Sequence, residues 1–152
     1  MMSTSQRRRF ISLLAGVAAG LLPVRVARAQ SDPFAALVRD VTGGVPVWPG
    51  RVKVETPLLA DNGHSVPLKV SVASPMTAVD HVRSITLLSE KNPRPVIAKF
   101  IFGQGAGRAE VVTRVRLNGA QRLLALAQLS DGSFWSGGAE VVVTESACLD
   151  ES

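Results

Sequence analysis

The sequence predicts an all-β fold, an antiparallel β-sandwich of about seven strands with a short N-terminal helix. Two observations lead to this prediction. From Arg51 onward, apolar residues alternate with polar ones at a period of two, in short segments. Turns rich in Gly, Pro, Asn and Asp separate these segments at roughly regular intervals. Strands of this length and spacing are typical of immunoglobulin-like sandwiches, although a single cysteine excludes their internal disulfide.

Residues 30–50 predict a helix followed by a linker. Asp32 is placed to cap this helix, Pro33 suits its first position, and Gly43-Gly44 can end it. Its apolar residues recur at spacings of three and four: Phe34, Leu37, Val38 and Val41. We expect this stripe to pack on its own domain, with a partner surface as the alternative. The following VPVWPG segment predicts a rigid linker in which Trp48 is a packing residue.

The predicted strands lie within residues 51–144. They cover residues 51–56, 66–72, 81–89, 96–102, 108–117, 121–129 and 134–144. Asp61-Asn62-Gly63 predicts a turn, and Pro67 suits an edge or a bulge. The fourth strand is expected to bury one side, formed by Val96, Ala98, Phe100 and Phe102. The Leu and Ala content of residues 121–129 also suits a helix, but the flanking turns and the short length favour a strand.

Residues 1–29 have the features of a cleavable export signal. Three arginines at Arg7–Arg9 precede an apolar run from Phe10 to Leu22, and Ala27-Arg28-Ala29 is a cleavage pattern. The paired arginines and weakly hydrophobic run favour the twin-arginine route and a periplasmic location. The alternative, an uncleaved anchor, is disfavoured because the run is shorter than the ~20 residues that cross a bilayer.

The export signal also accounts for the basic character of the chain. The full sequence has 17 basic and 12 acidic residues, and the signal contains five arginines and no acid. The mature chain therefore has twelve basic and twelve acidic residues, with no net charge. A basic nucleic-acid-binding protein is excluded on this balance. After cleavage no membrane segment is expected.

Motifs of known catalytic chemistry are absent from the sequence. His64 and His81 stand far apart without acidic or thiol ligands at metal-binding spacing, so we expect ordinary surface histidines. The GQGAGR segment is rich in glycine, but it connects two strands, whereas a phosphate-binding loop leads into a helix. We therefore predict that the protein is not an enzyme and has no metal site.

Cys148 is the only cysteine, and it stands near the C-terminus. We expect the sheet to end near Thr144, so residues 145–152 form an arm that places the thiol about 13–14 Å from the domain. An incidental cysteine is one interpretation. An exposed, odd thiol in an oxidising compartment also tends to cross-link, which favours a use in pairing with another chain or in covalent attachment.

The mature chain resembles the SoxY family, the periplasmic sulfur carriers of thiosulfate oxidation. The resemblance covers nearly the whole mature chain. It is carried by residues 50–144, above all by ADNGHSVPLKV, SPMT, EKNPRPVIAKF and LSDGSFW. It implies an immunoglobulin-like, non-enzymatic carrier without a cofactor, in a heterodimer with a SoxZ-like subunit. It further implies that a haem-c enzyme conjugates thiosulfate to Cys148, and that a hydrolase and a dehydrogenase then process the bound sulfur.

The residues that flank Cys148 depart from the family pattern. The usual VTIGGCGG ending has glycines on both sides, which give a thin and conformationally free arm. Here Ser146 and Ala147 precede the thiol, and Leu149 and two acidic residues follow it. Nearby carboxylates oppose thiolate formation. An adaptor with a vestigial cysteine, or one that forms a homodimer through Cys148, is therefore the alternative to a carrier.

Overall fold

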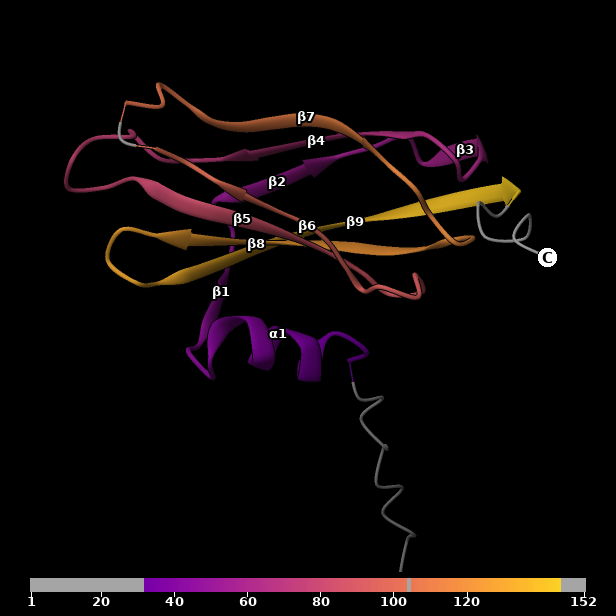
Figure 1. The fold of residues 1–152 in the computed structure, drawn as a ribbon, viewed down its shortest axis with the longest axis horizontal. Coiled ribbons are helices and arrows are strands. Elements are labelled where there is room, and N and C mark those ends of the chain that lie inside the picture. Colours follow the sequence, from indigo (N-terminus) through magenta and orange to yellow (C-terminus); the bar gives the residue numbers. More distant parts are fainter. Residues whose placement is uncertain (1–31, 104, 146–152) are drawn as a thin grey trace, which may run out of the picture. The chain divides into compact units, whose positions relative to one another are not determined.

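The computed structural model describes residues 32–103 and 105–145, which form one helix and nine strands (Figure 1). The predicted export signal, residues 1–29, lies outside the described residues. In chain order the elements are α1 (Ala35–Thr42), β1 (Val47–Pro49), β2 (Val52–Glu55), β3 (Leu59–Asn62), β4 (Val66–Val72), β5 (Val82–Ser89), β6 (Val96–Ile101), β7 (Ala109–Val115), β8 (Gln121–Leu129) and β9 (Phe134–Glu145).

The strands form two sheets that pack face to face, as Figure 1 shows, and this confirms the predicted sandwich. The larger sheet has the order β1-β9-β8-β5-β6, with β3 also paired to β9, and the smaller has the order β2-β4-β7. Neighbouring strands are antiparallel except for β1 and β3, which run parallel to β9. Val66, Leu68, Val70 and Val72 alternate into the core, because a strand turns every second side chain to one face.

The burial of strand β8 on both faces explains why its sequence suited a helix as well as a strand. Leu123, Ala125 and Ala127 face the core between the sheets. Leu126, on the opposite face, packs with Leu88 against the residues of the helix. A strand buried on both sides needs apolar residues throughout, so its sequence loses the alternation that identifies a half-buried strand.

Helix α1 packs on its own domain, as expected. The helix lies against the outer face of the larger sheet (Figure 1). Phe34, which precedes it, is buried there with Leu88 and Leu126. The Arg122 guanidinium lies 5.3 Å from the Phe34 ring centre and 3.0 Å from an Asp32 carboxylate oxygen, so it ties the start of the helix to β8. Among the described residues, no helix is long and apolar enough to cross a membrane.

The predicted helix start is wrong by two residues. The helix begins at Ala35, because Asp32, Pro33 and Phe34 form a preceding turn. The Asp32 carboxylate accepts the Phe34 N–H at 3.1 Å, and its backbone carbonyl accepts the Ala35 N–H at 2.9 Å. The end is as predicted: Gly43 adopts a left-handed conformation with φ of 65°, which glycine tolerates best.

Two strands, β1 and β3, were not predicted. The first lies in the expected linker, and the second includes Asp61 and Asn62 of the expected turn. Both are short and lack a repeated alternation, and they form because β9 offers an edge with which they pair. Trp48, expected to be a packing residue, is 58% exposed on β1.

The predicted buried side of β6 is also wrong in part. A bulge occurs where Leu87 pairs with Ala98 and Leu88 pairs with Val96, which leaves Ile97 without a direct partner. Ile97 packs against the core together with Phe100 and Phe102, whereas Val96 is exposed. The extra residue shifts the alternation by one, as a bulge requires.

Strand β2 passes over β9 in close contact at Gly137. A Cβ atom on Gly137 would collide with the backbone carbonyl of Val52, so only a hydrogen fits there. The chain reaches this crossing through Gly50 and Arg51, both with positive φ, of 96° and 54°. The Arg51 guanidinium lies 5.3 Å from the Trp135 ring centre and pairs with Asp80 at 3.0 Å.

Replacing Gly137 with alanine should lower the free energy of unfolding by about 2 kcal/mol or more, because the added methyl group must push two backbones apart. Urea denaturation measures the change. Gly107→Ala is the matched control, since nothing lies near its added Cβ and its φ is not positive. Equal unfolding midpoints for the two variants would contradict the close crossing.

Candidate functional site

The predicted site residues, Cys148 with Ser146, Ala147 and Leu149, lie outside the described residues. The structure describes the chain up to Glu145, where β9 ends, one residue beyond the expected end of the sheet. Glu145 is three residues from Cys148, which corresponds to about 10–11 Å of extended chain. The part of the candidate site that has a described geometry is therefore the end of β9 and the loops beside it.

Strand β3 pairs with the last residues of β9, from Val142 to Glu145. Leu59 pairs with Val142 and Ala60 with Val143, and the Val142 N–H donates to the Leu58 carbonyl at 2.8 Å. The Thr144 hydroxyl donates to the Asp61 carbonyl. These bonds fix the direction in which the chain leaves the domain.

Gly63 connects the end of β9 to the loop between β7 and β8. Its N–H donates to the Glu145 carbonyl at 2.7 Å, and its own carbonyl accepts the Leu117 N–H at 2.8 Å. Leu117 is fully buried in the core. The last described residue of β9 is thus anchored, through two backbone hydrogen bonds, to a residue that cannot move independently of the core.

The EKNPRP segment also lies at this end, and a buried glutamine orders it. The Gln121 side-chain carbonyl accepts the Ser89 hydroxyl at 2.8 Å and the Lys91 N–H at 3.0 Å. Its amide group donates to the Asn92 side-chain carbonyl at 3.0 Å. That same Asn92 oxygen accepts the Asn118 N–H at 2.9 Å. One buried side chain therefore fixes both the β5–β6 loop and the β7–β8 loop.

The surface at this end combines apolar and charged side chains. Lys91, Arg94 and Arg116 are exposed on the two ordered loops. At the end of β2, the hydrogen bond and ion pair from Lys53, at 2.7 Å, lower the pKa of the exposed Glu55 carboxyl. The exposed apolar and basic side chains available here are of the kind that can bind or orient a partner.

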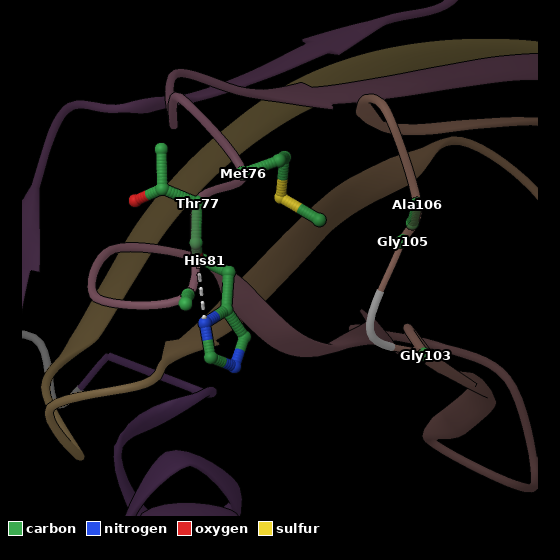
Figure 2. Close-up of a pocket in the computed structure, with 7 residues that line it drawn as sticks. Met76, Thr77, His81, Gly103, Gly105 and Ala106 are labelled. Atoms are coloured by element: carbon green, nitrogen blue, oxygen red, sulfur yellow. Dashed lines mark hydrogen bonds between the residues drawn. The ribbon is translucent and has the colours of Figure 1, made fainter.

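A hollow of about 180 Å³ lies beside His81 (Figure 2). It is at the opposite end of the sandwich from Glu145, because Val82, next to His81, pairs with Leu129 beside the β8–β9 turn. It is lined by Met76, Thr77, Ala78, His81, Gly103, Gly105 and Ala106. The His81 Nδ1 atom is 3.0 Å from the Thr77 carbonyl, which fixes the ring. Among residues 32–103 and 105–145, no three His, Cys, Asp or Glu side chains gather as metal ligands.

Sequence reasoning missed three features of the site: the pairing by which β3 holds the end of β9, the role of Gln121, and the basic loops. Only one of them had a signal in the sequence, since Asn and Gly flank the loops that Gln121 orders. The β3–β9 pairing joins Thr144 to Asp61, 83 residues apart. It is parallel, and no local sequence pattern predicts it.

Comparison with known proteins agrees with the resemblance seen in the sequence. The family described as sulfur oxidation protein SoxY matches residues 38–148. The structure of the sulfur carrier protein SoxY from Chlorobium limicola f thiosulfatophilum is similar, with a TM-score of 0.60 and 24% identity. The similarity covers 72% of this chain and 94% of that chain. No curated protein matches the sequence.

The fold is also similar to that of a different class of protein. The superoxide reductase (neelaredoxin) from Ignicoccus hospitalis gives a TM-score of 0.56 with 22% identity. This likeness covers 62% of the present chain and 80% of the reductase. At these identities, the structural matches show a shared fold and carry no activity with them.

Replacing Gln121 with leucine should lower the free energy of unfolding by about 2 kcal/mol, because buried donors from Ser89 and Lys91 lose their acceptor. Chemical denaturation measures this change, and the backbone amide signals of Lys91, Asn92 and Arg94 should shift in NMR spectra. Gln128→Leu, on the same strand, is the control and should change stability by less than about 0.5 kcal/mol. Similar losses in both variants would contradict the role assigned to Gln121.

Proposed function

Since the chain belongs to the SoxY family, we propose that it is a periplasmic carrier in the oxidation of thiosulfate and related sulfur compounds. Cys148 holds the sulfur intermediates covalently while the protein is bound to a SoxZ-like subunit. The observation that carries this proposal is the extent of the family match, which reaches Cys148 as its last residue. The only thiol of the chain thus lies inside the region that matches the family, at its end.

The chemistry requires an accessible thiolate. In the loading step, the Cys148 thiol and the sulfane sulfur of the thiosulfate dianion form a disulfide bond, which releases the thiol proton and two electrons. The electrons pass to the haem of a conjugating c-type enzyme. Water then cleaves the bond between the sulfane sulfur and the sulfonate group, so that sulfate leaves and a persulfide stays on Cys148. A dehydrogenase oxidises this remaining sulfur.

The geometry at the end of β9 supports an arm of this kind. The pairing with β3 and the hydrogen bond from Gly63 hold the backbone up to Glu145, so the arm has a fixed origin. Ser146 and Ala147 are small, and the thiol stands about 10–11 Å beyond that origin when the chain is extended. A fixed origin and a short arm confine Cys148 to a small volume, which raises its effective concentration at a partner docked beside β9.

The partner and the location rest on the sequence. The arginine pair and the cleavage pattern of residues 1–29 support export by the twin-arginine route, which carries folded or assembled proteins. Such a route suits a subunit that is exported together with a SoxZ-like companion. The companion, the haem-c enzyme and the hydrolase are the partners that the carrier role requires.

The residues after Cys148 favour one alternative. Leu149, Asp150 and Glu151 replace the glycines of the family, so the tail is bulkier and more acidic than a typical carrier arm. An adaptor that binds a SoxZ-like subunit or another periplasmic enzyme would keep the fold without loading the thiol. In that case Cys148 is vestigial, or it forms an intermolecular disulfide.

The carrier role predicts a covalent adduct on Cys148. Intact-mass measurement of the mature protein, purified from its periplasm with its partner, should show an increment that reduction removes. The increment should match a thiosulfonate or added sulfur atoms, and peptide mapping should place it on Cys148. Cys148→Ser, the control, should lose the increment and keep the same unfolding midpoint, because the residue lies beyond the sheet.

A thiol that stays bare when thiosulfate and the conjugating haem-c enzyme are supplied would exclude the carrier role. If Cys148→Ser also supports sulfur oxidation as well as the parent chain, the adaptor is the correct function. A mass equal to two chains, lost on reduction, would identify the intermolecular disulfide.

A further inference from the structure

Strand β6 forms a free edge of the larger sheet. It pairs with β5 on one side, and no strand in the described part of the chain pairs with its other side. The Phe102 N–H donates to the Arg83 carbonyl at 2.9 Å, and in an antiparallel pair every second residue turns its backbone groups to the neighbouring strand. Phe100 therefore faces β5 in the same way, whereas Lys99 and Ile101 turn their N–H and C=O groups to the free side.

The side chains of Lys99 and Ile101 are exposed beside these free backbone groups. They are two residues apart and thus share one face of the strand, and Ile101 is 81% exposed. Lys99 lies opposite Thr86, and Thr86 lies opposite Leu126, which packs with the residues of α1. The free edge therefore presents one cation and one apolar group on the face of the sheet that carries the helix.

The surroundings of β6 are basic. Five exposed cations lie on the strand, on the loops that flank it or on β5 beside it: Arg83, Lys91, Arg94, Lys99 and Arg108. None of them forms an ion pair within the described part of the chain. Residues 91–109 contain no acidic residue, and Glu90, just before them, is held by Arg122 at 3.6 Å. Because residues 30–152 have equal numbers of basic and acidic residues, β6 lies in a local excess of positive charge.

This charge decides which kind of strand can pair with the free edge. Two copies of β6 in an antiparallel pair would bring two Lys99 side chains and their neighbouring cations together, and like charges across a strand pair are destabilising. Lysine on an edge strand is one way in which proteins avoid pairing between identical edges. A strand that carries carboxylates is instead attracted, and the same free backbone groups are available to it.

We propose that β6 is a docking site for an extended acidic segment of a partner protein, which adds to the larger sheet as a further antiparallel strand. The backbone groups of Lys99 and Ile101 form its hydrogen bonds. A carboxylate of the segment lies opposite Lys99, and an apolar side chain two residues before it lies opposite Ile101. The remaining cations attract acidic residues on either side of these two. The site does not involve Cys148, so it goes beyond the carrier function and does not depend on whether the thiol is loaded.

A synthetic peptide, acetyl-Glu-Thr-Val-Thr-Glu-Thr-Glu-amide, is the probe for this site. In the proposed register its valine lies opposite Ile101 and its middle glutamate opposite Lys99. It is titrated to millimolar concentration into the isotope-labelled chain, residues 30–152, at low salt and followed by NMR. The amide signals of Lys99 and Ile101 should shift and their hydrogen exchange should slow, because free N–H groups gain acceptors, and added salt should weaken binding. An absence of shifts at β6, or larger shifts elsewhere, would overturn the proposal.

Two altered peptides separate strand addition from general attraction to a basic surface. Replacing the glutamates with lysines should abolish the shifts, because the charges then repel. Methylating the backbone nitrogens of the valine and the middle glutamate removes the two donors that face β6 and leaves the charges unchanged. This methylated peptide should bind about tenfold more weakly. Equal binding of the methylated and unmethylated peptides would show attraction to the cations alone and would overturn strand addition.

Variants of the chain test the placement of the site. Lys99→Ser and Ile101→Ser should each raise the dissociation constant of the peptide about threefold, the effect of losing one cross-strand pair. Both side chains are exposed, so neither change should move the unfolding midpoint appreciably. Arg114→Ser and Val112→Ser are the matched controls on β7, the edge strand of the smaller sheet, and they should leave binding unchanged. Equal effects of the changes on β6 and β7 would contradict docking at β6.

Discussion

The crossing of β2 over β9 at Gly137 is the contact on which the remaining architecture depends. The Val52 carbonyl occupies the space that any side chain would need, so the two sheets approach closely there. The chain can then leave the larger sheet after β1, pass through the smaller sheet as β2, and return as β3. β1 pairs with β9 before the crossing and β3 pairs with β9 after it. The longest strand is thereby fixed from its first residue to its last.

Because β9 is paired in this way, its last residue, Glu145, has a defined position. β3 and Gly63 hold the backbone as far as Glu145, and Gln121 orders the two loops beside it. Buried polar networks of this kind favour one arrangement over others, because each unsatisfied group would cost free energy. The stable end of the domain and the proposed carrier arm are consequently neighbours. The hollow beside His81 lies at the opposite end of the sandwich and takes no part in this arrangement.

The residues after Cys148 depart from the glycines expected of a carrier arm. Glycines allow an arm to pass through narrow spaces, whereas Leu149 and the two acidic residues that follow are bulkier and charged. A carrier with an unusual arm and an adaptor that has lost loading are both compatible with this change. Adduct formation on Cys148 separates the two.

The sequence was enough to predict the period-two strands, the apolar stripe of α1 and the chain position of Cys148, because each depends on residues close together in the chain. It also identified the family, since several motifs occur in order. The other features depend on how distant segments pack. β1 and β3 exist because β9 offers an edge, and the bulge at Ile97 changes which side chains are buried at the start of β6. Thr144 meets Asp61 across 83 residues, and such pairings depend on how distant strands pack, which no local pattern specifies.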